Sequence, residues 1–179
     1  MFEVEEWLHS RIGLNFRSGL GRMQRAVDLL GNPEKAYPTI HVTGTNGKGS
    51  TATFISNILI EAGYSVGLYT SPFLEVFNER IRLNGHNIDD QDLADSVELV
   101  KAACQKMVSG GLAHPTEFEL VTATAFVYYA GKGVDYVVLE VGLGGRYDAT
   151  NVIDKSLVSA IASISLDHTK VLGDTIDKV

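Results

Sequence analysis

Short apolar runs alternate with amphipathic stretches along most of the chain. Apolar runs rich in β-branched residues predict strands at 38–42, 66–70, 135–141 and 157–165. Apolar residues at helical spacing predict helices at 22–30, 48–62, 89–107 and 117–130. The last two strands are nearly all apolar, so both are expected to be covered on both faces. This alternation predicts a three-layer α/β fold with a mostly parallel sheet.

One short segment departs from the alternation. Residues 71–80 have no regular period, and a hairpin is expected at 81–88, with its turn at Asn84, Gly85 and His86. Asn and Gly favour the left-handed backbone that such a turn requires. The hairpin is therefore expected to add an antiparallel element next to the parallel strands.

The composition is that of one soluble domain. The chain has 179 residues, 45% of them hydrophobic, which is enough for one buried core. Its 15 Lys and Arg residues against 22 Asp and Glu give a net charge of −7, which disfavours nucleic acid and anionic membranes as partners. The single Cys104 cannot form an internal disulfide, the start does not read as a secretory signal, and the apolar runs are too short to span a bilayer. A cytoplasmic location is expected.

The strongest motif is HVTGTNGKGST at 41–51, between a predicted strand and a predicted helix. A glycine-rich turn there lets backbone N–H groups converge on phosphate oxygens, and Lys48 adds positive charge beside the β and γ phosphates. Ser50 or Thr51 could ligate Mg²⁺. The candidate ATP-binding residues are Thr45, Asn46, Gly47, Lys48, Gly49 and Ser50.

This loop differs from the standard Walker A motif, because Val42 occupies the first glycine position and Gly49 separates Lys48 from Ser50. The glycines alone could serve a tight turn, but a bare turn has no need of Lys48. His41 lies within the strand, where a packed or hydrogen-bonded core histidine is expected rather than a ligand.

Three candidate metal ligands each follow an apolar strand: Ser71, Glu140 and His168. If these strands are parallel, the three side chains share the sheet edge at which the phosphate loop also lies. Hydroxyl and carboxylate suit a hard cation such as Mg²⁺, whereas histidine is a less usual ligand for it. Taken singly, Ser71 could be a turn residue and His168 a strand-end cap.

Several blocks together resemble one family. GTNGKGS is the phosphate-loop form of the folylpolyglutamate and dihydrofolate synthases, which are relatives of the Mur ligases. The further blocks that resemble this family, in its order, are LYTSPF at 68–73, NERI at 78–81, TEFE at 116–119, LEVGLGGRYDATN at 139–151 and LDHTKVLG at 166–173. The resemblance implies a Mur-ligase-like central nucleotide-binding domain.

The resemblance also implies residue roles. Ser71, Glu140 and His168 would hold the metals, with Glu140 shared between two sites and with Lys48, Glu140 and His168 as catalytic residues. The implied folate-binding residues are Arg17, Ser18, Gly19, Leu20, Thr116, Glu117, Phe118, Glu119, Tyr147, Asp148 and Ala149. Chemically, Phe118 offers a stacking face, and Asp148 could accept hydrogen bonds from a heterocycle. Thr116 and Glu119 also fit a helix-capping box, and both roles can hold at once.

The implied reaction is the ATP-dependent addition of L-glutamate to folate or dihydropteroate through an acyl phosphate, with Mg²⁺ as cofactor, in a mostly monomeric family. Residues 1–179 are expected to form a single ATP-binding domain that lacks the family's carboxyl-terminal ligase domain, so this polypeptide should be inactive by itself. The alternatives are a Mur-type ligase of cell-wall precursors and a nucleotide-binding module without ligase activity. Gly49 and the blocks at 68–73 and 78–81 disfavour the Mur-type alternative.

Overall fold

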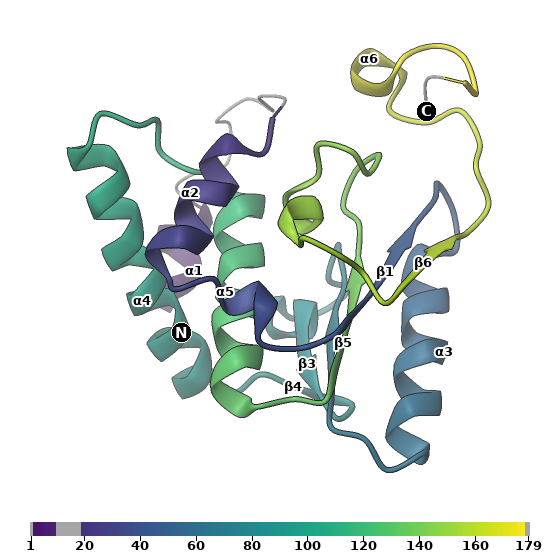
Figure 1. Ribbon diagram of the computed structural model, residues 1–179, viewed down its shortest axis with the longest axis horizontal. Helices are drawn as coiled ribbons and strands as arrows, with labels where there is room; N and C mark the ends of the chain where they lie inside the picture. The colour runs from purple at the N-terminus through teal and green to yellow at the C-terminus, as the bar shows by residue number, and fades with distance from the viewer. Residues whose placement is uncertain (1, 10–18, 178–179) are drawn as a thin grey trace.

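The computed structural model describes residues 2–9 and 19–177 (Figure 1). Its sheet has the strand order β4-β3-β2-β5-β1-β6. The strands are β1 Thr39–Thr43, β2 Val66–Tyr69, β3 Ile81–Leu83, β4 His86–Asn87, β5 Tyr136–Glu140 and β6 Val158–Ile161. Strands β2, β5, β1 and β6 run parallel, and the β3–β4 hairpin adds antiparallel to β2. The predicted hairpin is confirmed, with its turn residues Asn84 and Gly85 at positive φ.

Helices cover both faces of the sheet. The α-helices are α1 Phe2–His9, α2 Gly21–Leu29, α3 Lys48–Glu61, α4 Asp90–Ser109, α5 Glu117–Lys132 and α6 Thr169–Leu172. Short 3₁₀ turns occur as η1 Pro33–Lys35, η2 Phe77–Arg80 and η3 Ala149–Val152. Figure 1 shows α3 on one side of the sheet and α5, with α1, α2 and α4, on the other. The predicted three-layer α/β architecture, with a mostly parallel sheet, is confirmed.

The core has two parts, one on each face of the sheet. The larger part joins α2, α4 and α5 to the sheet, and the smaller part packs α3 against β1, β2 and β5. On the larger side Tyr129 lies flat enough on β2 that a Cβ at Gly67 would come within 2.7 Å of its ring. The Tyr129 hydroxyl donates to the Leu68 carbonyl at 2.7 Å. Gly67 therefore makes room for the ring that anchors α5 to the sheet.

The prediction for the last strand is wrong in two respects. The strand ends at Ile161 rather than at residue 165, and its side chains are not covered on both faces, because Val158 and Ile161 are 52% and 67% exposed. In the described part of the chain β6 is an edge strand that pairs with β1 alone. Beyond Ile161 the hydrogen bonds pass to the phosphate loop, where the Ser163 carbonyl accepts from the N–H of Thr45 at 2.8 Å.

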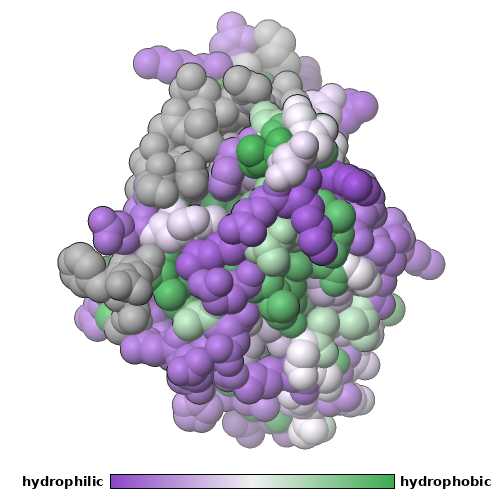
Figure 2. Space-filling model, turned by 90° about the vertical axis from the view of Figure 1, so that its left-hand side faces the viewer, coloured by the Kyte–Doolittle hydropathy of each residue, from purple (hydrophilic) through white to green (hydrophobic). Residues whose placement is uncertain are grey.

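The surface carries exposed apolar side chains. Figure 2 shows apolar side chains gathered on the face that bears α2 and α4. Leu99 of α4 is 57% exposed and borders a hollow between α2, α4 and α5. Among the described residues, no helix is both long and apolar enough to cross a membrane.

Candidate active site

The phosphate loop lies where β1 ends and α3 begins. Gly44 and Gly47 have positive φ values of 137° and 80°, which let the chain turn sharply into the helix. The Lys48 ammonium donates to the Thr45 carbonyl at 3.2 Å, and the Thr45 hydroxyl donates to the Ser165 carbonyl at 2.9 Å. The N-cap residue Gly47 has no side chain to cover the first N–H groups of α3, so this end of the helix suits an anion.

Glu140 ends the central strand β5 beside this helix start. Its side chain is 4% exposed, and Oε2 accepts the N–H of Ser71 at 2.9 Å. A Cβ at Gly49 would lie 3.4 Å from the same oxygen, and the Gly49 N–H also donates to the carboxylate. Burial raises the pKa of Glu140 above its ordinary value, while the Ser71 N–H, the Lys48 charge and the Gly49 N–H oppose that rise.

The carboxylate of Glu140 thus lies against the first turn of α3, where an added Cβ at Gly49 would be in ordinary van der Waals contact with it. Glu140 and Ser71, which meet through the Ser71 N–H at the carboxyl edge of the sheet, carry a carboxylate and a hydroxyl, the types of oxygen ligand that Mg²⁺ prefers. These residues fit the implied cation.

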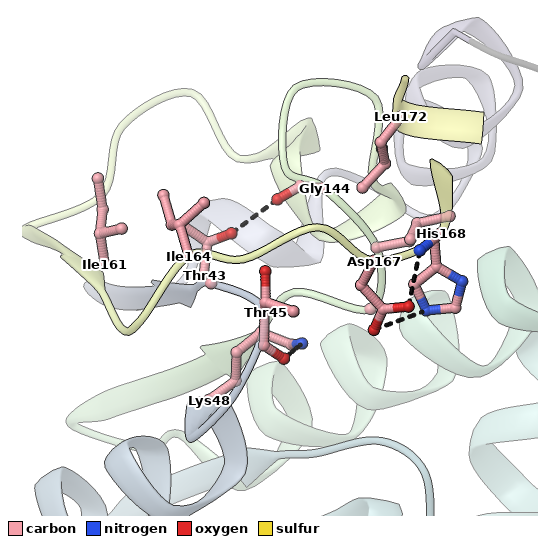
Figure 3. Close-up of a pocket in the computed structure, with 12 residues that line it drawn as sticks. Thr43, Thr45, Lys48, Gly144, Ile161, Ile164, Asp167, His168 and Leu172 are labelled. Atoms are coloured by element: carbon pink, nitrogen blue, oxygen red, sulfur yellow. Dashed lines mark hydrogen bonds and ion pairs between the residues drawn. The ribbon is translucent and has the colours of Figure 1, made fainter. Parts of the chain in front are cut away.

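A cavity of about 240 Å³ opens next to the loop (Figure 3). Its walls come from the phosphate loop, from the segment after β5 and from the segment after β6. The lining residues are Thr43, Gly44, Thr45, Lys48, Gly142, Leu143, Gly144, Ile161, Ile164, Asp167, His168 and Leu172. Figure 3 shows Lys48 and Thr45 on one side and Asp167 and His168 on another.

The structure therefore brings Ser71 and Glu140 together and places His168 in the wall of the cavity, which neither Ser71 nor Glu140 lines. Ser71 and Glu140 are in contact, as described above. The His168 side chain is 59% exposed, and its Nε2 lies 3.8 Å from Oδ2 of Asp167. The backbone of His168 is left-handed, with a φ of 47°. Among the described residues, no group of three or more His, Cys, Asp or Glu side chains is arranged to hold a metal ion.

The predicted acceptor residues at 116–119 form the start of α5. Thr116 and Glu119 make the expected capping box, with the Thr116 N–H donating to Glu119 Oε2 at 2.7 Å and the Glu119 N–H donating to Thr116 Oγ1 at 3.3 Å. Glu119 also forms a salt bridge with Arg22, with 3.0 Å between Glu119 Oε1 and a guanidinium nitrogen. This salt bridge joins the start of α2 to the start of α5. Gly19 and Leu20 immediately precede α2, whereas Arg17 and Ser18 lie outside the described residues.

Phe118 is half-buried and contacts three neighbours. Its ring lies against Gly142, where an added Cβ would come within 2.5 Å of Phe118 Cζ. It also contacts the Tyr69 ring, at a centroid distance of 6.1 Å, and the Arg80 guanidinium, 5.8 Å from its centroid. Arg80 pairs with Glu117 at 3.6 Å. The position of Arg80 was not anticipated from the sequence, although it lies within the 78–81 block.

The segment after β5 is held by Asp148, which is 4% exposed. Its Oδ2 accepts the Leu143 N–H at 2.9 Å, and its Oδ1 accepts both the N–H and the hydroxyl of Thr150, at 3.0 and 2.6 Å. Burial raises the pKa of Asp148, and these donors oppose that rise. Both oxygens are thus engaged within the chain. Next to Asp148, Tyr147 is 50% exposed and Ala149 is buried.

His41 is confirmed as a hydrogen-bonded histidine, and it lies partly buried in strand β1. Its Nε2 lies 2.8 Å from the Thr150 hydroxyl. Burial lowers the pKa of His41 from its ordinary 6.5 to about 4. The sequence offered no signal for Thr150 as its partner, because the two residues are 109 positions apart.

Comparison with known proteins finds relatives of similar sequence. No protein-family model matches the chain. The dihydrofolate synthase/folylpolyglutamate synthase of Bacillus subtilis is 45% identical over 178 residues, which are 99% of this chain and 41% of that relative.

Solved structures agree with this relationship. A folylpolyglutamate synthase in complex with AMPPCP and folate matches with a TM-score of 0.94 and 42% identity, over 99% of this chain and 43% of that one. Escherichia coli FolC in complex with DHPP and ADP matches with a TM-score of 0.88 and 36% identity, over 98% and 41%. This chain thus spans about two fifths of the length of the relatives it matches. By sequence and by fold, the chain is similar to part of the folylpolyglutamate and dihydrofolate synthases.

Proposed function

We propose that this chain is the ATP-binding part of a ligase that joins L-glutamate to a folate-type or dihydropteroate-type carboxylate. The observation that carries the proposal is the meeting of Lys48, Gly49, Ser71 and Glu140 at the carboxyl edge of the sheet. Relatives of the same fold bind AMPPCP with folate, and ADP with DHPP, which supports a nucleotide and a pterin-type acceptor here. The chain spans about two fifths of such relatives, so ligation is proposed for a complete polypeptide and not for this part alone.

The nucleotide would lie with its phosphates over the start of α3. Backbone N–H groups there and the Lys48 ammonium would offset the charge that develops on the transferred phosphoryl group. The residues proposed to contact ATP are Thr45, Asn46, Gly47, Lys48, Gly49 and Ser50. Ser71 and Glu140 would hold Mg²⁺, with His168 as a further ligand, and the ion would supply charge neutralisation on the phosphate oxygens.

The acceptor would lie beside the start of α5 and the segment after β5. The residues proposed for this side are Arg17, Ser18, Gly19, Leu20, Thr116, Glu117, Phe118, Glu119, Tyr147, Asp148 and Ala149. Tyr147 presents a half-exposed ring, whereas Phe118 is packed against Gly142 and Tyr69. The exposed Tyr147 ring is therefore the more accessible stacking face for a flat heterocycle.

The reaction proceeds in two transfers. An oxygen of the acceptor carboxylate attacks the γ-phosphorus of ATP, and the bond from that phosphorus to the β,γ-bridging oxygen breaks. ADP is the leaving group, and the acceptor becomes an acyl phosphate. The amine of glutamate then attacks the acyl carbon, inorganic phosphate leaves, and the nitrogen loses a proton to give the amide. The protein contributes mainly positioning and charge compensation to both transfers. We further propose that residues 1–179 form a single ATP-binding domain of a monomeric, cytoplasmic enzyme.

Replacement of Lys48 tests this proposal. In the complete polypeptide, Lys48→Ala should abolish acceptor-dependent ATP turnover, because the change removes the ammonium proposed to lie beside the phosphates, while circular dichroism and thermal unfolding stay unchanged. Lys101→Ala is the matched control, since Lys101 pairs with Glu98 on α4, at the surface. Turnover that survives Lys48→Ala would remove the nucleotide role. ATP binding without any response to pteroate or folate would instead favour a nucleotide-binding module.

A further inference from the structure

A chain of hydrogen bonds links β1 to the segment that follows β5. It runs from His41 Nε2 to the Thr150 hydroxyl at 2.8 Å, and from that hydroxyl to Asp148 Oδ1 at 2.6 Å. His41 is partly buried, and Thr150 and Asp148 are buried. Hydrogen-bonded polar groups in such surroundings fix one arrangement, because breaking any link leaves a buried group unpaired.

The direction of each hydrogen bond follows from the chemistry of the three groups. A carboxylate only accepts, so the single proton of the Thr150 hydroxyl points to Asp148. The hydroxyl oxygen is then left to accept, and His41 must donate from Nε2. Burial holds the pKa of His41 at about 4, so at neutral pH the ring is uncharged and carries its proton on Nε2.

Asp148 connects this hydrogen-bond chain to the wall of the cavity. Its other oxygen accepts the N–H of Leu143, and Gly142, Leu143 and Gly144 line the cavity together with Lys48. A second tie runs from the Thr43 hydroxyl to the Gly144 carbonyl at 2.7 Å (Figure 3). The segment 142–150 is therefore fixed to β1, the same strand that leads into the phosphate loop.

The opposite side of this segment meets the proposed acceptor residues. Gly142 packs against Phe118, and Tyr147 directly precedes Asp148. One short segment thus borders both sides: Gly142, Leu143 and Gly144 line the cavity, and Gly142 also packs against Phe118 of the proposed acceptor side. A shift of this segment would change the distance between the two substrates without altering the phosphate loop.

We propose that His41, Thr150 and Asp148 are positioning residues that fix the 142–150 segment, so that the acceptor carboxylate meets the nucleotide phosphate in register. This inference rests on the proposed ligase function and assigns none of the three residues to direct contact with phosphate. Loss of the chain should therefore act on the acceptor and on the chemical step, and should leave nucleotide binding nearly unchanged.

The test replaces the middle of the chain in the complete polypeptide. Thr150→Val keeps the shape of the side chain but removes the hydroxyl, whereas Thr150→Ser keeps the hydroxyl. We expect Thr150→Val to lower kcat/KM for the folate-type acceptor by roughly tenfold, with less than about a twofold change in KM for ATP. Thr150→Ser should recover most of the loss. Equal losses in both variants, or an unchanged acceptor kcat/KM in Thr150→Val, would overturn the positioning role.

A second measurement does not depend on activity. The ¹⁵N resonances of the His41 ring at pH 7 should report a neutral ring protonated at Nε2 in the parent and in Thr150→Ser. A ring protonated at Nδ1 in the parent would refute the hydrogen-bond chain. If Thr150→Val does not fold, His41→Leu and His41→Gln replace it: the first should lose acceptor kcat/KM and the second, which retains an N–H donor, should lose less.

The two hypotheses fail in different ways. A parent polypeptide with no acceptor-dependent ATP turnover would contradict the proposed function, whatever the variants do. A parent that turns over normally, with acceptor constants that do not respond to Thr150→Val or His41→Leu, would contradict only the positioning role.

Discussion

The contact between Gly142 and Phe118 gives a sharp steric prediction. A methyl group added at Gly142 would lie 2.5 Å from Phe118 Cζ, 2.8 Å from Phe118 Cε2 and 3.1 Å from Asp148 Oδ2. Carbon atoms in contact normally stay about 3.5–4.0 Å apart, so the ring or the segment must move by about 1 Å. Phe118 cannot retreat freely, because Tyr69 and Arg80 pack against the same ring.

Overpacking of this kind typically costs about 1–3 kcal/mol. For a chain of this length, each kcal/mol lowers Tm by about 2–4 °C. We therefore expect Gly142→Ala to lower Tm measurably in thermal unfolding followed by circular dichroism, and to raise KM for the acceptor, since the displaced parts belong to the proposed acceptor side.

Two comparisons make the cause specific. Gly131→Ala is the matched control, because an added Cβ meets nothing within 4 Å and the residue lies in α5, where alanine is favoured over glycine by up to about 1 kcal/mol. The double variant Gly142→Ala with Phe118→Leu should lose less stability than the sum of the two single losses, because the smaller side chain frees space. Strictly additive losses, or a Gly142→Ala protein that melts with the parent, would refute this reasoning.

Two further predictions concern stability. The pKa of His41 falls from 6.5 to about 4 on folding, so the unfolded chain binds the proton more readily between these values. The contribution of neutral His41 to the free energy of unfolding is therefore complete above pH 6.5 and falls by up to about 3 kcal/mol as the pH is lowered to 4. Urea titrations of the parent at several pH values should show this fall, and those of His41→Gln should not. Parallel pH profiles of the two proteins would contradict the prediction. Thr116→Ala removes the hydroxyl that caps α5 and should cost about 1 kcal/mol in the same titrations, whereas Thr116→Ser should cost little; equal losses would rule out the cap.

Most of the fold could be predicted from local patterns. The buried strands β1, β2 and β5 are short, mainly apolar runs that alternate with helices along the chain. The phosphate loop was equally visible, because its glycines and Lys48 occupy a strand-to-helix turn. The edge strand β6 was misjudged, since an apolar run does not reveal whether anything packs on it.

The site was less predictable, because its contacts depend on register between distant segments. Glu140 could be placed at a strand end, but its hydrogen bond to Ser71 spans 69 positions and its approach to Gly49 depends on the start of α3. The TEFE segment at 116–119 did not predict that Glu119 pairs with Arg22, because the two residues are 97 positions apart. Asp148 showed its acceptor chemistry in the sequence, but not which donors would occupy it.

The two edge strands of the sheet, β4 and β6, differ in how readily another strand could pair with them. At one end β4 is only two residues long and offers few backbone groups for pairing. At the other, β6 pairs with β1 alone among the described residues, and its outer backbone groups together with its apolar side chains are the combination that templates edge-to-edge pairing. An additional strand, from elsewhere in the same polypeptide or from a second molecule at high concentration, would therefore form more backbone hydrogen bonds beside β6 than beside β4.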